Sequence, residues 1–226
     1  MATTNKQQQA TPTMEETLNK SEAFFLKYKK AIIAAVVALI VIIAGTVLYK
    51  TYVSEPNEQK ASTAIAKGQD YFAQGLYQQA LEGDSLGFKG FAKLADEYSS
   101  TAAGNLARLY AGICNAQLGK WDAAVKFLED YDGADDDMVS PAAEGALGNA
   151  YAHLNQLDKA VSHLKKAAEK ADNNSLSPTF LIQAGEILES QGKKDEALKL
   201  YKQVKEKYFN SMQYQTIDAY IERVSE

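Results

Sequence analysis

The sequence predicts an all-α chain in which a single N-terminal transmembrane helix is followed by a superhelix of paired antiparallel helices. Two observations predict this fold. One is a long uncharged apolar run near the start, and the other is a set of small residues that recurs in phase four times. A third observation, a turn residue at the same place in every repeat, predicts where the first helix of each pair ends.

The apolar run covers residues 31–48 (AIIAAVVALIVIIAGTVL) and contains no charge and one hydroxyl. As an α-helix it would span about 27 Å, close to the apolar thickness of a bilayer. A buried core helix of this length would show a polar face, and this one has none. We therefore predict a signal-anchor helix with its flanks at residues 17–53. A cleavable signal sequence is the alternative, because Ala44-Gly45-Thr46 resembles a cleavage site, although the apolar run is longer than usual.

The residues flanking the apolar run predict its orientation. Four lysines precede it and one follows closely: Lys20, Lys27, Lys29, Lys30 and Lys50. Positive charge is retained in the cytoplasm, so the N-terminus is expected inside the inner membrane and the large C-terminal domain in the periplasm. Residues 1–16 begin with a Gln- and Thr-rich stretch without apolar pattern, which predicts a disordered cytoplasmic tail.

The repeated small residues form a grid in which a Gly is followed twelve residues later by an Ala. The four pairs are Gly68/Ala80, Gly112/Ala124, Gly148/Ala160 and Gly185/Ala197. Seven residues after each Gly stands a turn residue: Gly75, Gly119, Asn155 and Gly192. The Gly lets helix A lie close to helix B, the turn residue takes the left-handed conformation that ends helix A, and the Ala is expected to be the reciprocal contact on helix B.

The grid resembles a known repeat family. Successive grid alanines are 44, 36 and 37 residues apart, near the 34-residue unit of tetratricopeptide repeats. The third unit fits best, with Leu147-Gly148-Asn149-Ala150-Tyr151 followed by Ala160 and Leu164. Over about residues 57–209 the chain resembles this family, although the final Pro of the unit is missing from every copy. The resemblance implies a tetratricopeptide-type superhelix at residues 57–226, with about four units and a capping helix.

Local signals predict the boundaries of these units. The Gly-rich segment Gly83–Gly90 is expected to break the first unit before a second helix at residues 91–98, and the alternative is that this unit is only a cap. Ser140-Pro141 and Ser177-Pro178 each suggest a capping Ser before a Pro at the first helical position. Residues 213–224 carry apolar residues at helical spacing, which predicts the capping helix.

Charge and chemistry exclude several functions. Residues 54–226 hold 18 Lys and Arg against 26 Asp and Glu, a net charge of −8, which argues against nucleic-acid binding. Cys114 is predicted to be a small buried residue, and His153 and His163 lack the spacing of a zinc pair. Asp135-Asp136-Asp137 lacks the pattern of a calcium loop. We therefore expect no enzyme activity, no catalytic residue, no metal, no cofactor and no small-molecule substrate.

The family resemblance implies that a partner binds the concave face, which is lined by fixed positions of each helix A. The candidate partner-binding residues on successive A helices are Leu109, Ile113, Asn149, His153, Ile182 and Glu186. This set lacks the paired Lys and Asn that clamp a C-terminal carboxylate in some members of the family. A partner segment, extended or helical, should therefore be held mainly by apolar contact. The alternative is that several of these residues pack inside the array.

The layout also resembles membrane-anchored periplasmic tetratricopeptide proteins that are ancillary subunits of the Sec translocon. That resemblance implies a chaperone-like module whose partners are the translocon, a periplasmic folding factor or exported chains. The alternative function is a structural scaffold in a cell-envelope assembly or division complex. Residues 92–109 favour this alternative, because they also resemble repeats of envelope-assembly lipoproteins.

Overall fold

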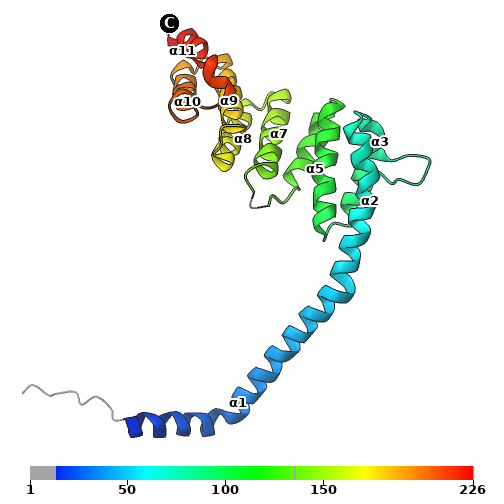
Figure 1. The fold of residues 1–226 in the computed structure, drawn as a ribbon, viewed down its shortest axis with the longest axis vertical. Helices are drawn as coiled ribbons and strands as arrows, with labels where there is room; N and C mark the ends of the chain where they lie inside the picture. Colours follow the sequence, from blue (N-terminus) through cyan, green and yellow to red (C-terminus); the bar gives the residue numbers. More distant parts are fainter. Residues whose placement is uncertain (1–13, 135, 226) are drawn as a thin grey trace, which may run out of the picture. The chain divides into compact units, whose positions relative to one another are not determined.

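The protein, a computed structural model that describes residues 14–134 and 136–225, is all-α as predicted. The described part contains eleven α-helices, one short π-helix and one 3-10 helix, and no strand (Figure 1). The chain divides into two units, residues 1–55 and residues 56–226, each of which is described by itself.

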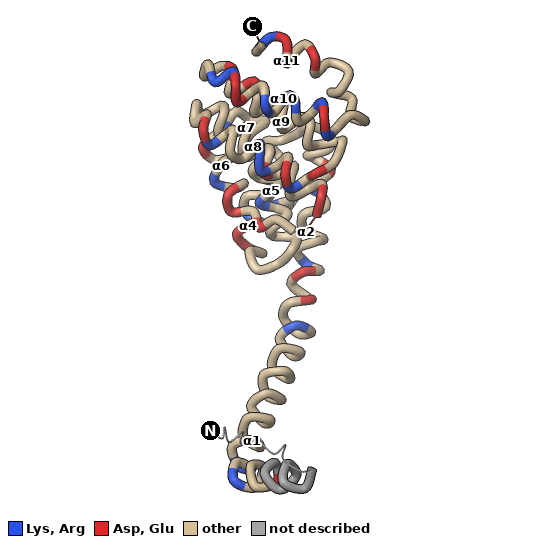
Figure 2. Tube along the Cα trace, turned by 90° about the vertical axis from the view of Figure 1, so that its left-hand side faces the viewer, with Lys and Arg blue, Asp and Glu red and all other residues tan. Residues whose placement is uncertain are grey.

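The described residues of the first unit are helical. Helix α1 (Met14–Tyr49) contains the uncharged run, and the π-helical segment η1 (Lys50–Ser54) follows it. A long stretch of α1 carries no charged residue (Figure 2). Among the described residues, one helix is long and apolar enough to cross a membrane, and no residue of its apolar window is buried. Most of the predicted tail at residues 1–16 lies outside the described residues, and its last three residues begin α1.

The second unit is a row of antiparallel helices (Figure 1). The first repeat has α2 (Glu55–Ala73), α3 (Tyr77–Glu82) and α4 (Phe91–Glu97). The next three are the pairs α5 (Ala102–Gln117) and α6 (Trp121–Glu129), α7 (Val139–His153) and α8 (Leu157–Ala171), and α9 (Ser177–Ser190) and α10 (Lys194–Lys207). The short η2 (Met212–Gln215) and α11 (Ile217–Ser225) close the array in place of the single capping helix expected.

The four turn residues of the grid adopt the predicted left-handed conformation. Their φ angles are 74° at Gly75, 72° at Gly119, 57° at Asn155 and 73° at Gly192. This region costs a glycine nothing and an asparagine little, so each helix A ends where the sequence places its turn residue. The inserted segment also turns at glycines, because Gly83, Gly87 and Gly90 all have positive φ.

In the last three units the nearest side chain to the grid glycine is not the expected Ala. A Cβ on Gly112 would lie 2.7 Å from Leu128 Cγ, and one on Gly148 would lie 2.9 Å from Leu164 Cγ. The corresponding contact of Gly185 is the ring of Tyr201. In these three units the large residue one turn after the grid Ala is therefore the main contact, because its long side chain crosses the helix interface. In the first unit Gly68 instead faces the rings of Phe88 and Phe91.

The helix starts near the two Ser-Pro pairs also differ from the prediction. Helix α7 begins at Val139, and Asp136 accepts hydrogen bonds from the amides of Met138 and Val139. Before α9, Asn173 Oδ1 accepts from the amides of Ser175 and Leu176. The expected serine caps are wrong, because each helix starts earlier than expected. Asp136 holds the first amide of α7, and Asn173 holds the amides of the turn that precedes α9.

Candidate functional site

An open groove of about 650 Å³ lies along helices α5, α7 and α9. Its floor is apolar and its walls carry aromatic and amide side chains. The groove, as the term is used below, is lined by Ile113, Ala116, Gln117, Gly119, Trp121, Ala146, Asn149, Ala152, His153 and Gln183. Grooves of this volume fall in the range that proteins use to bind ligands and peptide segments.

One wall of the groove is a stack of two rings from successive repeats. The rings of Trp121 and His153 lie parallel, with centroids 3.7 Å apart and an interplanar angle of 3°. Trp121 begins α6 directly after the turn at Gly119, and His153 ends α7 just before the turn at Asn155. The turn geometry encoded in the sequence therefore brings these two rings together.

The groove contains three of the six residues predicted to bind a partner. Ile113, Asn149 and His153 line it. Glu186 is exposed on α9, three residues after Gln183, and so lies on the same side of that helix. These four residues are accessible to a partner, and their role in binding stays a prediction.

The other two predicted residues are buried and need correction. Leu109 is 6% exposed and packs with Leu128 and Leu147 between α5, α6 and α7. Ile182 is 8% exposed and belongs to the cluster around Leu164 and Leu181. Each side chain is covered by a neighbouring helix, so both residues stabilise the array and do not line the groove. The alternative that several of the predicted residues pack inside the array therefore holds for these two.

The structure also adds groove residues that the sequence reasoning missed. Gln183 stands next to Ile182, and one residue turns a side chain about 100° around a helix. If the groove-facing positions of α9 were assigned one residue later, Gln183 would have been in the predicted set. Trp121 was absent from the predicted set because that set was drawn only from the A helices, and Trp121 is the first residue of a B helix.

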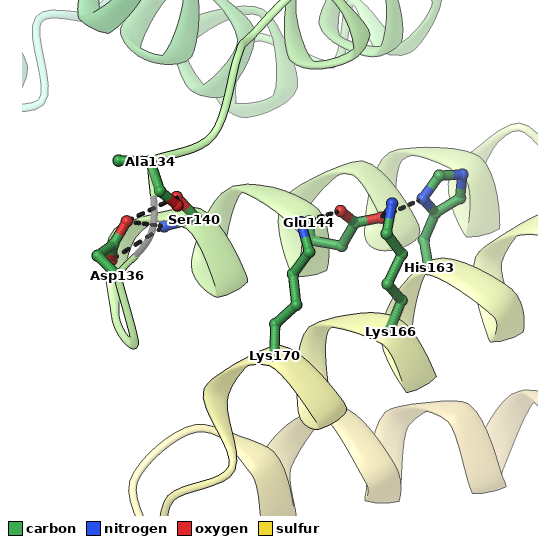
Figure 3. Close-up of polar contacts among 7 residues, drawn as sticks. All are labelled: Ala134, Asp136, Ser140, Glu144, His163, Lys166 and Lys170. Atoms are coloured by element: carbon green, nitrogen blue, oxygen red, sulfur yellow. Dashed lines mark hydrogen bonds and ion pairs between the residues drawn. The ribbon is translucent and has the colours of Figure 1, made fainter. Parts of the chain in front are cut away.

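A second hollow, of about 370 Å³, lies on another side of α7 and is charged. Glu144 is five residues from Asn149, so the two side chains leave the helix about 140° apart. We call the cluster of Glu144, His163, Lys166 and Lys170 the charged hollow (Figure 3). Glu144 Oε1 lies 2.7 Å from His163 Nδ1 and 3.1 Å from Lys166 Nζ, and Oε2 lies 3.3 Å from Lys170 Nζ.

The groups of the charged hollow satisfy one another. The carboxylate of Glu144 is 10% exposed, and burial by itself raises its pKa. The hydrogen bonds from His163, Lys166 and Lys170 outweigh burial and hold the pKa of Glu144 below its ordinary value. Glu144 thus ties α7 to α8 as an ionised group with all its contacts made inside the protein.

Asp136 shows the same internal pairing at the start of α7 (Figure 3). Its carboxylate accepts from the Ser140 hydroxyl at 2.6 Å and from backbone amides of the first turn, and these bonds lower the pKa of Asp136 to about 2. Asp136 and the charged hollow are therefore explained by folding.

The residues tested for chemistry give no catalytic arrangement. Cys114 is buried, and burial raises the pKa of its thiol to about 12, far from a reactive value. His153 stacks on Trp121 and His163 contacts Glu144, each in a separate place. Within residues 14–134 and 136–225 no group of three His, Cys, Asp or Glu side chains could hold a metal ion.

The comparisons with known proteins give one family. The family model that describes the N-terminal domain of EccA1, a protein of the type VII (ESX-1) secretion system, matches residues 52–217, more than two thirds of the chain. None of the curated proteins matches the chain. The matched range contains every residue of the groove and of the charged hollow.

Proposed function

We propose that this chain, which belongs to the family of the N-terminal domain of the ESX-1 secretion system protein EccA1, is a membrane-anchored module that binds other proteins during secretion. The observation that carries the proposal is the open groove along α5, α7 and α9, whose lining contains no Asp, Glu, Lys or Arg. A helical repeat array presents such a surface to a partner without needing to rearrange. The module acts by binding and not by catalysis.

The location is part of the proposal. Helix α1 anchors the protein in the inner membrane, with the N-terminus in the cytoplasm and residues 57–226 in the periplasm. The length and apolarity of this helix and the excess of lysines before residue 31 support this arrangement. A periplasm-active reporter fused after Glu226 should be active, and a cytoplasm-active reporter at the same site should be silent. The reverse pattern would show that residues 57–226 lie in the cytoplasm.

Within that location we propose an ancillary role beside the translocon, in which the groove holds exported chains before they fold. The secretion system named in the family description and the uncharged groove support this role. A scaffold for envelope assembly would also use a binding surface, but it would hold a folded envelope protein. The two roles therefore differ in what contacts the groove.

Site-specific crosslinking in native membranes tests the proposal. A photo-crosslinking side chain at Asn149, in the groove, should capture translocon subunits or newly exported chains in the full-length protein. The matched position is Gln203, which is exposed on α10 outside the groove. Ala152→Tyr, which places a ring in the groove next to Asn149 and His153, should abolish the Asn149 products. Capture of envelope-assembly enzymes would favour the scaffold, and products from Gln203 alone would move the binding site to the outer surface.

A further inference from the structure

Three carboxamide side chains line the groove without bonding to the protein. Gln117, Asn149 and Gln183 make no side-chain hydrogen bond within the described part of the chain, and Gln183 Oε1 is a buried acceptor without a donor. Amides that support the fold behave differently. Asn105 Nδ2 donates to the Asp132 carbonyl at 2.6 Å, and its Oδ1 accepts from the Asp132 amide at 2.9 Å. The fold therefore leaves the hydrogen-bonding capacity of the groove amides unused.

The chemistry of a carboxamide selects the kind of partner. Each carboxamide carries an acceptor oxygen and two N–H donors, which match the N–H and C=O groups of a peptide main chain. A partner helix has already used these main-chain groups on itself, whereas an extended segment has them free. Gln183 Oε1 is buried without a donor, so a turn of its side chain toward the groove would let it gain the hydrogen bond that it lacks from a partner N–H.

The charges around the groove narrow the choice of partner further. No lysine or arginine lines it, so nothing there would hold the carboxylate of a chain terminus. Ile113, Ala116 and Ala152 offer an apolar floor for side chains. One turn beyond Gln183 on α9, Glu186 is exposed and has no ion-pair partner among the described residues. A segment that leaves the groove along α9 would therefore meet an unpaired carboxylate.

We propose that the groove holds the main chain of an extended, internal segment of an unfolded polypeptide through Gln117, Asn149 and Gln183. Aliphatic side chains of the segment lie on the floor, and a Lys or Arg at one end lies beside Glu186. This inference rests on the proposed function, because it assumes that the groove is the partner site. It adds that recognition is of the main chain, with a preference for a neighbouring positive charge.

Binding of labelled peptides to the full-length protein in nanodiscs tests the inference. The probe is a short end-capped peptide of Leu, Val, Ser and Gly with one terminal Lys, followed by fluorescence anisotropy. Asn149→Leu combined with Gln183→Met should weaken binding by about tenfold, as expected for the loss of two ordinary hydrogen bonds. Gln203→Met, the matched change on the exposed surface of α10, should leave binding unchanged. A probe with N-methylated main-chain amides should bind weakly to every variant.

A second variant and its matched control test the preference for a positive charge in the bound segment. A probe with Glu in place of Lys should bind the parent protein more weakly, and Glu186→Gln should remove this difference. Glu169→Gln, on the exposed surface of α8, should leave it in place.

The outcomes separate this inference from the proposed function. If Ala152→Tyr abolishes binding while the amide variant binds like the parent, the groove remains the partner site and main-chain recognition is wrong. If the free-carboxylate form of the probe binds best, terminal recognition replaces internal recognition. If Ala152→Tyr leaves binding unchanged and circular dichroism shows a folded protein, the proposed function itself fails.

Discussion

Helix α7 carries two polar surfaces that differ in how their groups are paired. In the charged hollow, Glu144 has His163, Lys166 and Lys170 as internal partners (Figure 3). In the groove, Asn149 has no side-chain hydrogen bond within the described residues, although it leaves the same helix only five positions later. A polar group with all its bonds made inside the protein contributes to folding, and one without them is available for binding.

The difference follows from which helix covers each side of α7. Helix α8 packs along the side that holds Glu144 and Gly148, and its lysines reach back to the carboxylate. The side that holds Asn149 and Ala152 faces the groove and is left open. Changes on the covered side of α7 should therefore destabilise the protein more than changes on the open side. Three predictions follow from the contrast between groups that the fold uses and groups that it leaves without a partner.

The largest expected effect comes from adding volume. Gly148→Leu would press against α8, because even a Cβ at this position would lie 2.9 Å from Leu164 Cγ and 3.1 Å from Leu164 N. Overpacking of this kind should reduce the free energy of unfolding by about 1–3 kcal/mol. Ala152→Leu adds volume to the open side and should change it by about 0.5 kcal/mol or less. Urea unfolding of a fragment that covers residues 56–226 measures both changes in the free energy of unfolding. Equal losses would contradict the difference between the covered and open sides of α7.

The second prediction compares two half-buried asparagines. Asn105→Ala removes both hydrogen bonds to Asp132 and should cost about 1–2 kcal/mol. Asn149→Ala removes a side chain that bonds to nothing in the described protein and should cost about 0.5 kcal/mol or less. The same unfolding measurement applies. A larger loss at Asn149 would mean that its amide supports the fold and is not held in reserve for a partner.

The smallest expected effect is dependent on pH. Because the pKa of Glu144 is held below its ordinary value in the folded protein, its stabilising effect is complete above the unfolded pKa, near about 4.3. That effect disappears as the pH falls through the folded pKa. Glu144→Gln should therefore cost about 1 kcal/mol at pH 7, since its lysine partners are about half exposed, and less as the pH falls below about 4. If the cost of Glu144→Gln does not change with pH, ionised Glu144 does not stabilise the fold.

Much of the fold could be predicted because its signals are local and periodic. Gly75, Gly119, Asn155 and Gly192 all adopt positive φ. A left-handed turn needs such a residue whatever surrounds it. The uncharged run at residues 31–48 lies within one helix, as its length and lack of charge predicted. Four turns and one apolar run were enough to predict the all-α fold.

Which side of each helix lines the groove could not be predicted in the same way. Leu109 and Ile182 occupy positions expected to face a partner, yet α7 covers the first and the surrounding core cluster covers the second. Gln183 and Trp121 reach the groove instead. One residue changes the direction of a side chain by about 100°, and repeats of 44, 36 and 37 residues shift this direction from one unit to the next.

The sequence by itself therefore determined the all-α class, the long apolar helix and the place where each helix A ends, because each depends on residues that act locally. Only the tertiary structure decided that Glu144 is paired by α8 while Asn149, Gln117 and Gln183 are left open in one groove. Whether a polar side chain is satisfied depends on which donors and acceptors the neighbouring helices bring within about 3 Å, and that distance is set by packing across the whole array.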